Sequence, residues 1–353
     1  MKNKEALFNA ATMAIAIAVS FLIAFVIVLF VSTQPGDVME ALLLGPVSSV
    51  RNFGNVIELM TTFMFTGLAI SIMFQAGQFN VGAEGAFFIG ALAAAGAATA
   101  LNLGTAVQPI VSVAAGAGAG ALVTFIPGIL KAKLNASELV SSLMMNYAVL
   151  FLGLFILNYF LRDPKFGMLA TNAIDETAKL PNIVPGTRIN GGLIIALGLL
   201  VFMYFNIYRT KSGYELRLVG SNETFAKYTG VNVPKIIILS QIFGGAVAGI
   251  GGASEMLGMY DRFQWTSLPG YGWDGVIIAI LAYNKPQNIP LAAFFLAYLR
   301  IGSDIMARST DVPKELIIII QAVIMLLITA KALLGNLKHK MVVKEVVSGG
   351  NNI

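Results

Sequence analysis

Long apolar stretches limit what this chain can fold into more than any other feature of its sequence. Residues 85–130 contain no Asp, Glu, Lys or Arg, and further uncharged stretches follow from one end of the chain to the other. An α-helix needs about 20 mostly apolar residues to cross a bilayer, so residues 85–130 alone are enough for two crossings. The sequence therefore predicts an all-α, polytopic transmembrane bundle that forms a single membrane domain, residues 1–353.

The composition excludes a soluble protein and several kinds of chemistry. Hydrophobic residues make up 57% of the chain and charged residues 12%, whereas a soluble domain carries about 25% charged residues. There is no cysteine, so disulfides, thiol nucleophiles and thiolate metal sites are excluded. The only histidine, His339, lies in a polar C-terminal stretch, and we assign no metal. Anionic lipid at the inner leaflet accounts for the net charge of +5 without a nucleic-acid partner.

Uncharged runs predict about ten spans. They cover residues 10–31, 59–74, two segments of 85–130 on either side of a break at 102–109, then 139–161, 191–208, 236–254, 275–284, 290–299 and 316–330. The first run is too long for the apolar core of a signal peptide, which has about 7–15 residues. We therefore expect it to remain as the first transmembrane helix.

The distribution of basic residues predicts the orientation of these spans. With a cytoplasmic N-terminus and alternating sides, most of the 23 Lys and Arg residues fall in cytoplasmic segments, in agreement with the positive-inside rule. Both termini are then cytoplasmic, as are a loop at 209–235 and a tail at 334–353. A loop at 162–190 is external.

Small residues recur at helical spacing in two of the predicted spans. Gly116 and Gly120, and likewise Gly245 and Gly249, are separated by three residues. This spacing puts both glycines of a pair on one helix face, where a neighbouring backbone can approach closely. We interpret both pairs as sites of helix packing.

Two short segments resemble each other at the starts of the third and eighth predicted spans. Residues 82–85 read Gly-Ala-Glu-Gly and residues 272–275 read Gly-Trp-Asp-Gly. An offset of five spans places the two halves in inverted orientation, and inverted repeats are common in transporters. The match is four residues long, so an inverted repeat and a chance similarity both stay open.

Glu84 lies between two long uncharged stretches and has two interpretations. A charge at membrane depth is costly unless it is paired or hydrated, so Glu84 and Asn80 are candidates for a watery path. A carboxylate in the first turn of a helix also satisfies free N–H groups, which makes Glu84 a candidate helix cap. Both roles can hold at once. We expect Glu138 and Glu255 at the membrane interfaces.

The predicted cytoplasmic loop is long for a connection between two membrane helices, which usually has about 2–8 residues. Asn222 is placed to cap a short helix at 223–228, and Gly230 is placed to end it. Such a polar helix is either a docking surface or an ordinary solvated interfacial helix.

The same loop resembles the coupling-loop pattern of ABC permeases, T-x2-G-x3-R-x2-G-x-N-x3-A-x3-G. Residues 77–85 are similar to the signature F-N-I-G-x-E-G of that family, residues 137–147 to its block N-E-V-x4-M-L-N-Y, and residues 270–281 to its block G-x-G-[FW]-D-G-I-A-V-A-L-L. Ser137 and Met145 depart from the second block. The chain thus resembles the branched-chain amino acid and simple-sugar permease family over about residues 37–333, and its nucleoside branch most.

This resemblance implies a ten-span fold of the type II ABC importers and a place in a larger assembly. A second permease, usually a homologous but different chain, two cytoplasmic ATPase subunits and an external substrate-binding lipoprotein complete the importer in a bacterial inner membrane. Nucleosides then cross by ATP-driven alternating access. The chain has no G-x4-G-K-[ST] phosphate loop, so ATP and Mg²⁺ are expected on the partner ATPase, and this chain is expected to be no enzyme and to bind no cofactor.

Two sets of candidate residues follow, and the other function classes stay open at this point. The expected ATPase-coupling residues are Thr210, Gly213, Glu215, Arg217, Gly220, Asn222, Ala226 and Gly230. The expected translocation-path residues are Phe79, Asn80, Glu84, Asn146, Trp273 and Asp274. The alternatives are a simple-sugar ABC permease, an ion-coupled secondary transporter and a structural membrane protein.

Overall fold

The computed structural model describes residues 32–312 and a few isolated positions outside that range. Within residues 32–312 the regular structure is helical, and two isolated bridges, Arg162 with Thr171 and Asn182 with Asn190, are the sheet-like pairings found there. The chain divides into two compact units, residues 1–53 with 298–353, and residues 54–297. Each unit is described separately, and the single-domain organisation stays a prediction.

Long apolar helices make up most of the described chain. In order they are α2 (Pro35–Leu43), α3 (Val50–Gln75), α4 (Ala83–Ala100), α5 (Gln108–Leu134), α6 (Glu138–Ile156, continued by a π-helical turn, Leu157–Leu161), α7 (Gly192–Arg209), α8 (Lys211–Ser221), α9 (Glu223–Tyr228), α10 (Val233–Met259), α11 (Tyr271–Leu281) and α12 (Ile289–Ser309). Short 3₁₀ turns lie at Gly45–Val47, Glu176–Ala178 and Pro286–Asn288.

Seven helices of the described part are long and apolar enough to cross a membrane. They are α3, α4, α5, α6, α7, α10 and α12, and the predicted break at 102–109 lies in the connection between α4 and α5. The predicted spans 10–31 and 316–330 lie largely outside the described residues.

The predicted span at 275–284 is not a complete crossing. This segment belongs to α11, which has 11 residues. At about 1.5 Å per residue it covers roughly 16 Å, about half of the hydrocarbon core. The predicted count of ten spans is therefore not confirmed.

Glycines bring the backbones of α4, α5 and α10 into contact at the centre of residues 54–297. A Cβ added to Gly120 on α5 would lie 2.9 Å from the Cα of Gly249 on α10, and a Cβ on Gly116 would lie 2.9 Å from the carbonyl oxygen of Gly90 on α4. Real Cβ atoms do not approach so closely, so only glycine fits. The prediction that the two glycine pairs are packing sites is confirmed, and the pairs pack against each other.

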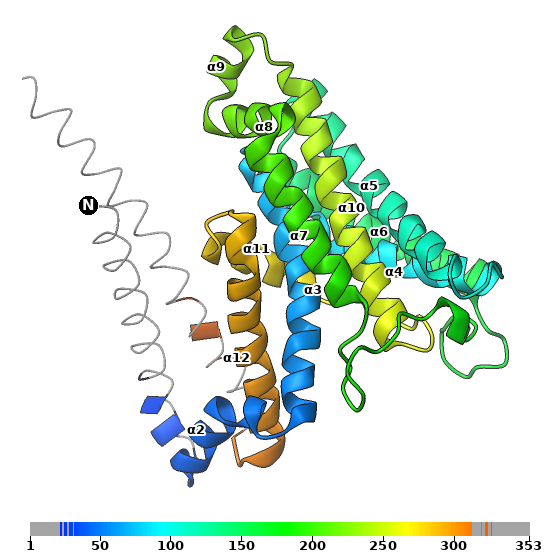
Figure 1. Ribbon diagram of the computed structural model, residues 1–353, viewed down its shortest axis with the longest axis vertical. Helices are drawn as coiled ribbons and strands as arrows, with labels where there is room; N and C mark the ends of the chain where they lie inside the picture. Colours follow the sequence, from blue (N-terminus) through cyan, green and yellow to red (C-terminus); the bar gives the residue numbers. More distant parts are fainter. Residues whose placement is uncertain are drawn as a thin grey trace, which may run out of the picture. The chain divides into compact units, whose positions relative to one another are not determined.

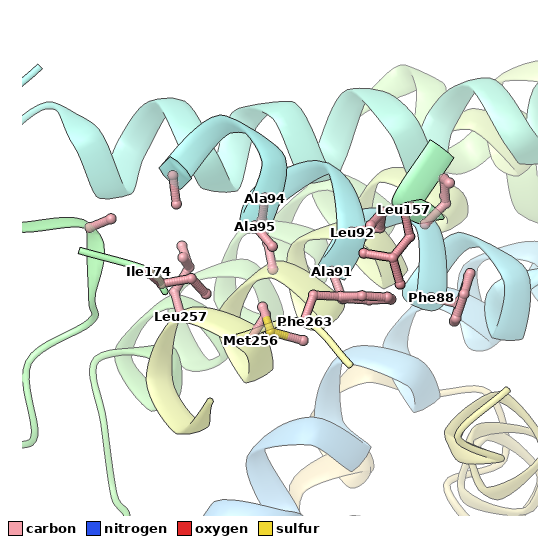
Figure 2. Close-up of a cluster of buried hydrophobic side chains, with 14 of the residues drawn as sticks. Phe88, Ala91, Leu92, Ala94, Ala95, Leu157, Ile174, Met256, Leu257 and Phe263 are labelled. Atoms are coloured by element: carbon pink, nitrogen blue, oxygen red, sulfur yellow. The ribbon is translucent and has the colours of Figure 1, made fainter. Parts of the chain in front are cut away.

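A hydrophobic core fills the space beside this glycine contact. Buried side chains from α4, α6, α10 and the loops at 163–178 and 260–268 form one cluster (Figure 2). The ring of Phe88 on α4 meets that of Phe263 edge-to-face, with the centroids 5.5 Å apart, a favourable arrangement for two aromatic rings. By contrast, only 22% of the apolar windows of α5, α6 and α7 are fully buried, as expected of helices whose solvent is lipid or a further membrane helix.

The polar segments of residues 54–297 gather at two opposite ends. Figure 1 shows α8 and α9 at one end and the long loop 162–190 at the other. Gly220 of α8 lies against the end of α3, near Gly77, whereas Thr187 of the loop contacts α3 at Gly54. We call these the coupling end and the loop end.

The unit of residues 1–53 and 298–353 holds α2 against the second half of α12. The Tyr298 hydroxyl donates to the carbonyl oxygen of Leu43 at 2.5 Å, and Gly302 lets α12 approach the backbone of Leu42. Asp311 accepts hydrogen bonds from the hydroxyl of Ser32 at 2.5 Å and from the backbone N–H of Thr33 at 2.9 Å. These bonds lower the pKa of the Asp311 carboxyl to about 2.

We predict that Gly120→Val lowers the free energy of unfolding of the purified protein by about 1–3 kcal/mol, because the added methyl groups overpack the contact between α5 and α10. Gly118→Val is the matched control, since Gly118 lies on the same helix with nothing within 4 Å of an added Cβ. Thermal unfolding of both variants measures the difference. Equal melting temperatures would contradict a packing role for Gly120.

Candidate coupling surface and translocation site

The α7–α8–α9 corner is built by side-chain caps. The Thr210 hydroxyl accepts from the backbone N–H of Gly213 at 3.1 Å and starts α8. The Asn222 side chain accepts from the backbone N–H of Phe225 at 2.9 Å and starts α9. Gly230 follows α9 with a φ of +84°, a left-handed conformation that favours glycine. The predicted short helix at 223–228, its cap and its end are confirmed.

Small and apolar residues fasten this corner to the membrane helices. Gly213 lies against the carbonyl groups that end α7, and Gly220 lies against the end of α3, where larger residues would not fit. Ala226 is fully buried. Three of the residues predicted for ATPase coupling therefore fix the position of α8 and α9, and two of them, Gly213 and Ala226, are buried and leave little surface for a partner.

The exposed face of the corner is aromatic and basic. Tyr214, Phe225 and Tyr228 are exposed, Tyr228 to 87%. The predicted coupling residue Arg217 stacks on the ring of Tyr208, with its guanidinium carbon 5.3 Å from the centroid. The three aromatic residues were not predicted from the sequence, although their position in a polar, predicted cytoplasmic loop was a usable signal.

A second predicted coupling residue, Glu215, lies on the same helix and is partly covered. Its carboxylate is 3.8 Å from the Lys211 ammonium group one helical turn earlier. An exposed pair of this kind contributes little to stability. Glu215 is therefore available to contact a partner without loss of the fold.

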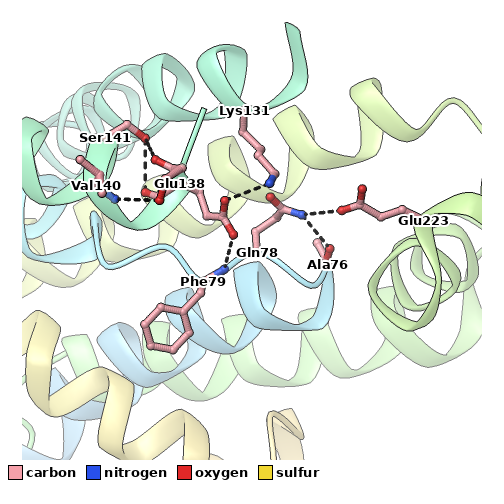
Figure 3. A network of polar contacts seen from close by, with 9 residues as sticks. Ala76, Gln78, Phe79, Lys131, Glu138, Val140, Ser141 and Glu223 are labelled. Carbon is pink, nitrogen blue, oxygen red and sulfur yellow. Dashed lines mark hydrogen bonds and ion pairs between the residues drawn. The ribbon is translucent and has the colours of Figure 1, made fainter. Parts of the chain in front are cut away.

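A polar network ties the coupling end to the segment 76–82, which connects α3 to α4. Gln78 donates to the carboxylate of Glu223 on α9 at 3.1 Å. The backbone N–H of Phe79 donates to the carboxylate of Glu138 at 3.3 Å, and Glu138 pairs with Lys131 of α5 at 3.1 Å. Figure 3 shows these bonds meeting around segment 76–82, with the ring of Phe79 pointing away from them. Glu138 thus fastens this segment to α5 and α6.

Glu84 caps a helix, but the helix is α11 and not its own α4. The side chain is only 2% exposed, and its two oxygens accept from the backbone N–H groups of Gly270 at 2.6 Å and Gly272 at 2.5 Å. Those groups begin a helix that starts inside the bundle, where no intrahelical partner exists for them. The negative charge also lies at the positive end of the α11 dipole.

Two asparagines hold the chain that leads into Glu84. Asn146 of α6 accepts from the backbone N–H of Gly85 at 2.9 Å and donates to the carbonyl of Val81 at 3.2 Å. Asn80 accepts from the N–H of Gly82 at 2.6 Å, and its buried NH₂ group has no hydrogen-bond partner among the described residues. The segment thus contains a polar donor free for another group.

The two similar segments found in the sequence meet in space. A Cβ on Gly272 would lie 2.6 Å from the backbone nitrogen of Glu84. Asp274 is buried close enough for its charge to act on Glu84, whereas Phe79 and Trp273 are about half exposed. The structure brings Asn80, Glu84, Asn146 and Asp274 together around the start of α11. A translocation role for all six predicted residues stays a prediction.

At the loop end, ion pairs outside the membrane-spanning helices join the loop 162–190 to residues 261 and 262. Arg262 donates to Asp163 at 2.6 Å, and this bond lowers the pKa of the Asp163 carboxyl. Lys179 bonds to Asp261 at 2.5 Å and to Glu176 at 2.8 Å, which raises the pKa of the Lys179 ammonium group. The sequence contains these residues, but their pairing joins positions far apart in the chain.

Residues 52–329 match the protein family described as branched-chain amino acid transport system / permease component. The chain belongs to this family. Its match covers well over half of the sequence and includes every helix described above except α2.

Relatives of this permease match over most of their length. A guanosine ABC transporter permease of Bacillus subtilis is 34% identical over 85% of this chain and 88% of that protein. A glucose ABC transporter permease of Haloferax volcanii is 31% identical over 85% and 82%. A nucleoside ABC transporter permease of Lactococcus lactis is 29% identical over 90% of each chain.

A solved structure of a metal-chelate type ABC transporter, in an inward-facing conformation, aligns with 93% of this chain and 99% of that chain. The TM-score is 0.47 and the sequence identity 14%. The family match and the seven candidate spans make the permease a multi-pass membrane subunit of an ABC transporter, and the resemblance predicted from sequence is confirmed.

We predict that Glu84→Ala destabilises the permease by about 1–3 kcal/mol for each buried N–H group that loses its partner. Glu84→Gln keeps one acceptor oxygen, so its loss is smaller. Thermal unfolding of the purified variants measures both, with Glu40→Ala, at an exposed position of α2, as the control. Equal stability of the Ala and Gln variants would contradict the capping role.

Proposed function

We propose that this permease carries nucleosides inward across a bacterial cytoplasmic membrane, as part of an ATP-driven importer. The observation that carries the substrate class is the 34% identity to a guanosine permease over 85% of the chain, supported by the nucleoside permease that matches 90% of each chain. ATP and Mg²⁺ bind a partner ATPase, a second permease chain completes the pathway, and an external lipoprotein delivers the substrate.

The ATPase docks on the aromatic face of α8 and α9. Three features support this docking surface: Tyr214, Phe225 and Tyr228 are exposed, the corner beneath them is fastened to α3 and α7, and the surrounding loop is basic. Exposed aromatic side chains on a rigid support are frequent anchors of protein interfaces. The coupling end is then cytoplasmic and the loop end external, which agrees with the distribution of Lys and Arg.

Movement of α9 reaches the membrane interior through the segment 76–82. Gln78 bonds to Glu223 of α9, and a few residues later the same segment enters α4 at Glu84, which holds the start of α11. A shift of α9 driven by the ATPase therefore changes the support of a half-length helix. Such broken helices lie next to substrate sites in other transporters, and two states of this support would give alternating access.

The polar groups around the start of α11 suit an uncharged, hydrogen-bonding solute. The free NH₂ group of Asn80 is a donor, and the half-exposed rings of Phe79 and Trp273 offer flat apolar surfaces. A nucleoside has a planar base and a hydroxyl-bearing sugar that match these features. We place the substrate near this cluster during transport.

A second candidate substrate is a simple sugar. The observation that favours it is the 31% identity to a glucose permease. A nucleoside and a simple sugar would use the same importer architecture, but only the nucleoside has a flat base. Competition between unlabelled glucose and radiolabelled guanosine therefore separates them.

Uptake of radiolabelled nucleosides by a deletion strain, with and without this gene, tests the proposal. Cells that retain ATP but lack a proton gradient should take up nucleosides only when the gene is present. Uptake that disappears with the gradient would contradict an ATP-driven importer. Glucose uptake in place of nucleoside uptake would move the substrate class to sugars.

We predict that Tyr228→Ser lowers ATP-dependent uptake roughly tenfold, because an exposed aromatic anchor contributes about 1–2 kcal/mol or more to an interface. The purified chain should keep its melting temperature, since Tyr228 is 87% exposed. Tyr159→Ser, at a 72% exposed position away from α8 and α9, is the control and should transport normally. Wild-type uptake by the Tyr228 variant would place the ATPase elsewhere.

A further inference from the structure

A small cavity lies between α3 and α10 near the loop end, and its lining includes neither Glu84 nor any residue of α11. Glu58, Thr62, Ser254 and Glu255 line it, and its volume is about 10 Å³. This is close to the least space that one water molecule or a small ion requires.

Two carboxyl groups face each other across this cavity. Glu255 is 5% exposed and accepts a hydrogen bond from the hydroxyl of Thr62. The Glu58 side chain approaches it closely enough for a hydrogen bond between the two carboxyl groups. We had expected Glu255 at a membrane interface; it lies near the end of α10 with its side chain buried, and its depth in the membrane stays a prediction. Two adjacent carboxylates in a low-dielectric interior repel each other strongly unless a positive charge lies between them.

The surrounding residues supply only part of that positive charge. Among the residues that the structure describes, no Lys or Arg nitrogen lies within 4 Å of Glu58 or Glu255. Arg188 of the loop 162–190 acts on both through space. With both carboxyl groups ionised, two negative charges and one positive charge leave a net charge of −1. One further monovalent cation is needed to balance the cluster.

The phenol of Tyr260 faces the same cluster and supplies no charge to it. Burial, followed by the negative charges of Glu255 and Glu58, raises the pKa of this phenol to about 12. Tyr260 therefore stays neutral at physiological pH. Because the charges of both carboxyl groups raise the pKa of this phenol, the phenol lies near both of them.

An unpartnered hydroxyl points to an occupant of the cavity. Ser254 lines the cavity and is 2% exposed, and its oxygen has no hydrogen-bond partner among the described residues. Buried hydroxyl groups are nearly always hydrogen-bonded or ligated. Carboxylate and hydroxyl oxygens are also the ligands that hard cations prefer. A water molecule alone would satisfy Ser254 but would leave the charge unbalanced.

A second cavity at the loop end adjoins residues that interact with the carboxyl pair. This cavity is wider, about 430 Å³, and Lys179, Arg188, Tyr260 and Asp261 are among its lining residues. Arg188 and Tyr260 thus adjoin both the wide cavity and the carboxyl pair. Within the wide cavity, Glu176 and Asp261 are paired with Lys179, whereas neither Glu58 nor Glu255 has an ion-pair partner within 4 Å in the described part of the chain.

We propose that Glu58 and Glu255, with the hydroxyl groups of Thr62 and Ser254, bind one small monovalent cation, a sodium ion or a proton, between α3 and α10. The bound cation holds the two helices together at the loop end. The site is separate from the substrate cluster and does not rest on the identity of the substrate. Its occupancy follows the ionic composition on that side of the membrane.

Thermal unfolding of the purified full-length chain tests this site. The protein is measured in sodium chloride and in choline chloride at equal ionic strength, each over a series of pH values. If sodium is bound, the melting temperature at neutral pH is about 3 °C higher in sodium at roughly ten times the dissociation constant. Equilibrium binding of radioactive sodium then saturates at one ion per chain.

If the cation is a proton, the choline and sodium profiles coincide and stability depends on pH instead. The folded state then holds a proton that the unfolded state releases, so stability falls as the pH rises. The slope with pH is the measured quantity. Either result supports the site and identifies its cation.

Glu255→Gln removes one negative charge with little change in shape and should abolish the sodium effect or flatten the pH profile. Glu58→Gln, at a half-buried position, makes the same test if the Glu255 variant does not fold. Glu176→Gln is the matched control, because it changes an exposed carboxylate of the loop end. The control should keep the wild-type response.

The proposal is overturned if neither sodium nor pH changes the melting temperature of the wild-type protein more than it changes the melting temperatures of the two Gln variants. Because the readouts are stability and ion binding of the purified chain, this outcome is distinct from a failure of nucleoside transport. Ser254→Ala refines a positive result. It should weaken sodium binding several-fold and leave a proton-dependent profile unchanged, since a proton needs no further ligand.

Discussion

The start of α11 sets the strongest physical requirement on this permease. A helix that begins inside the membrane presents backbone N–H groups that lipid cannot satisfy. The carboxylate of Glu84 meets this requirement, because its two oxygens accept from Gly270 and Gly272 and its charge faces the positive end of the helix. The half-length helix, the tight approach of Gly272 to Glu84 and the polar cluster with Asn80 and Asn146 all depend on this contact.

Glycine contacts give the same bundle its rigid centre. Gly90, Gly116, Gly120 and Gly249 bring three helices together with no side chain between them, which maximises van der Waals contact where the hydrophobic effect offers no drive. Around this centre, the polar connections concentrate at the two ends. A rigid interior with a polar link from Glu223 through Gln78 to the segment before α4 suits transmission of movement from one end to the middle.

Some residues of the coupling corner hold it in place and others form its exposed face, and the sequence motif does not distinguish these two roles. Gly213 and Ala226 are buried, and Gly220 lies against the end of α3, so these three residues shape the corner. Tyr214, Phe225 and Tyr228 form its exposed face. These motif residues therefore support the docking surface from beneath, whereas the exposed aromatic residues lie outside the motif. The carboxyl pair at the loop end makes a similar point, since Glu58 and Glu255 lie almost two hundred positions apart and neither belongs to a motif.

The sequence by itself determined the helical membrane class, the boundaries of most long helices, the cap at Asn222, and the family. These features depend on local composition, on spacing along one helix or on contiguous motifs. Only the tertiary structure decided that α11 is a half-length helix, that Glu84 caps it, and that Glu255 is buried opposite Glu58. Each of these depends on which distant residue lies beside a polar group, and one-dimensional patterns do not contain that information.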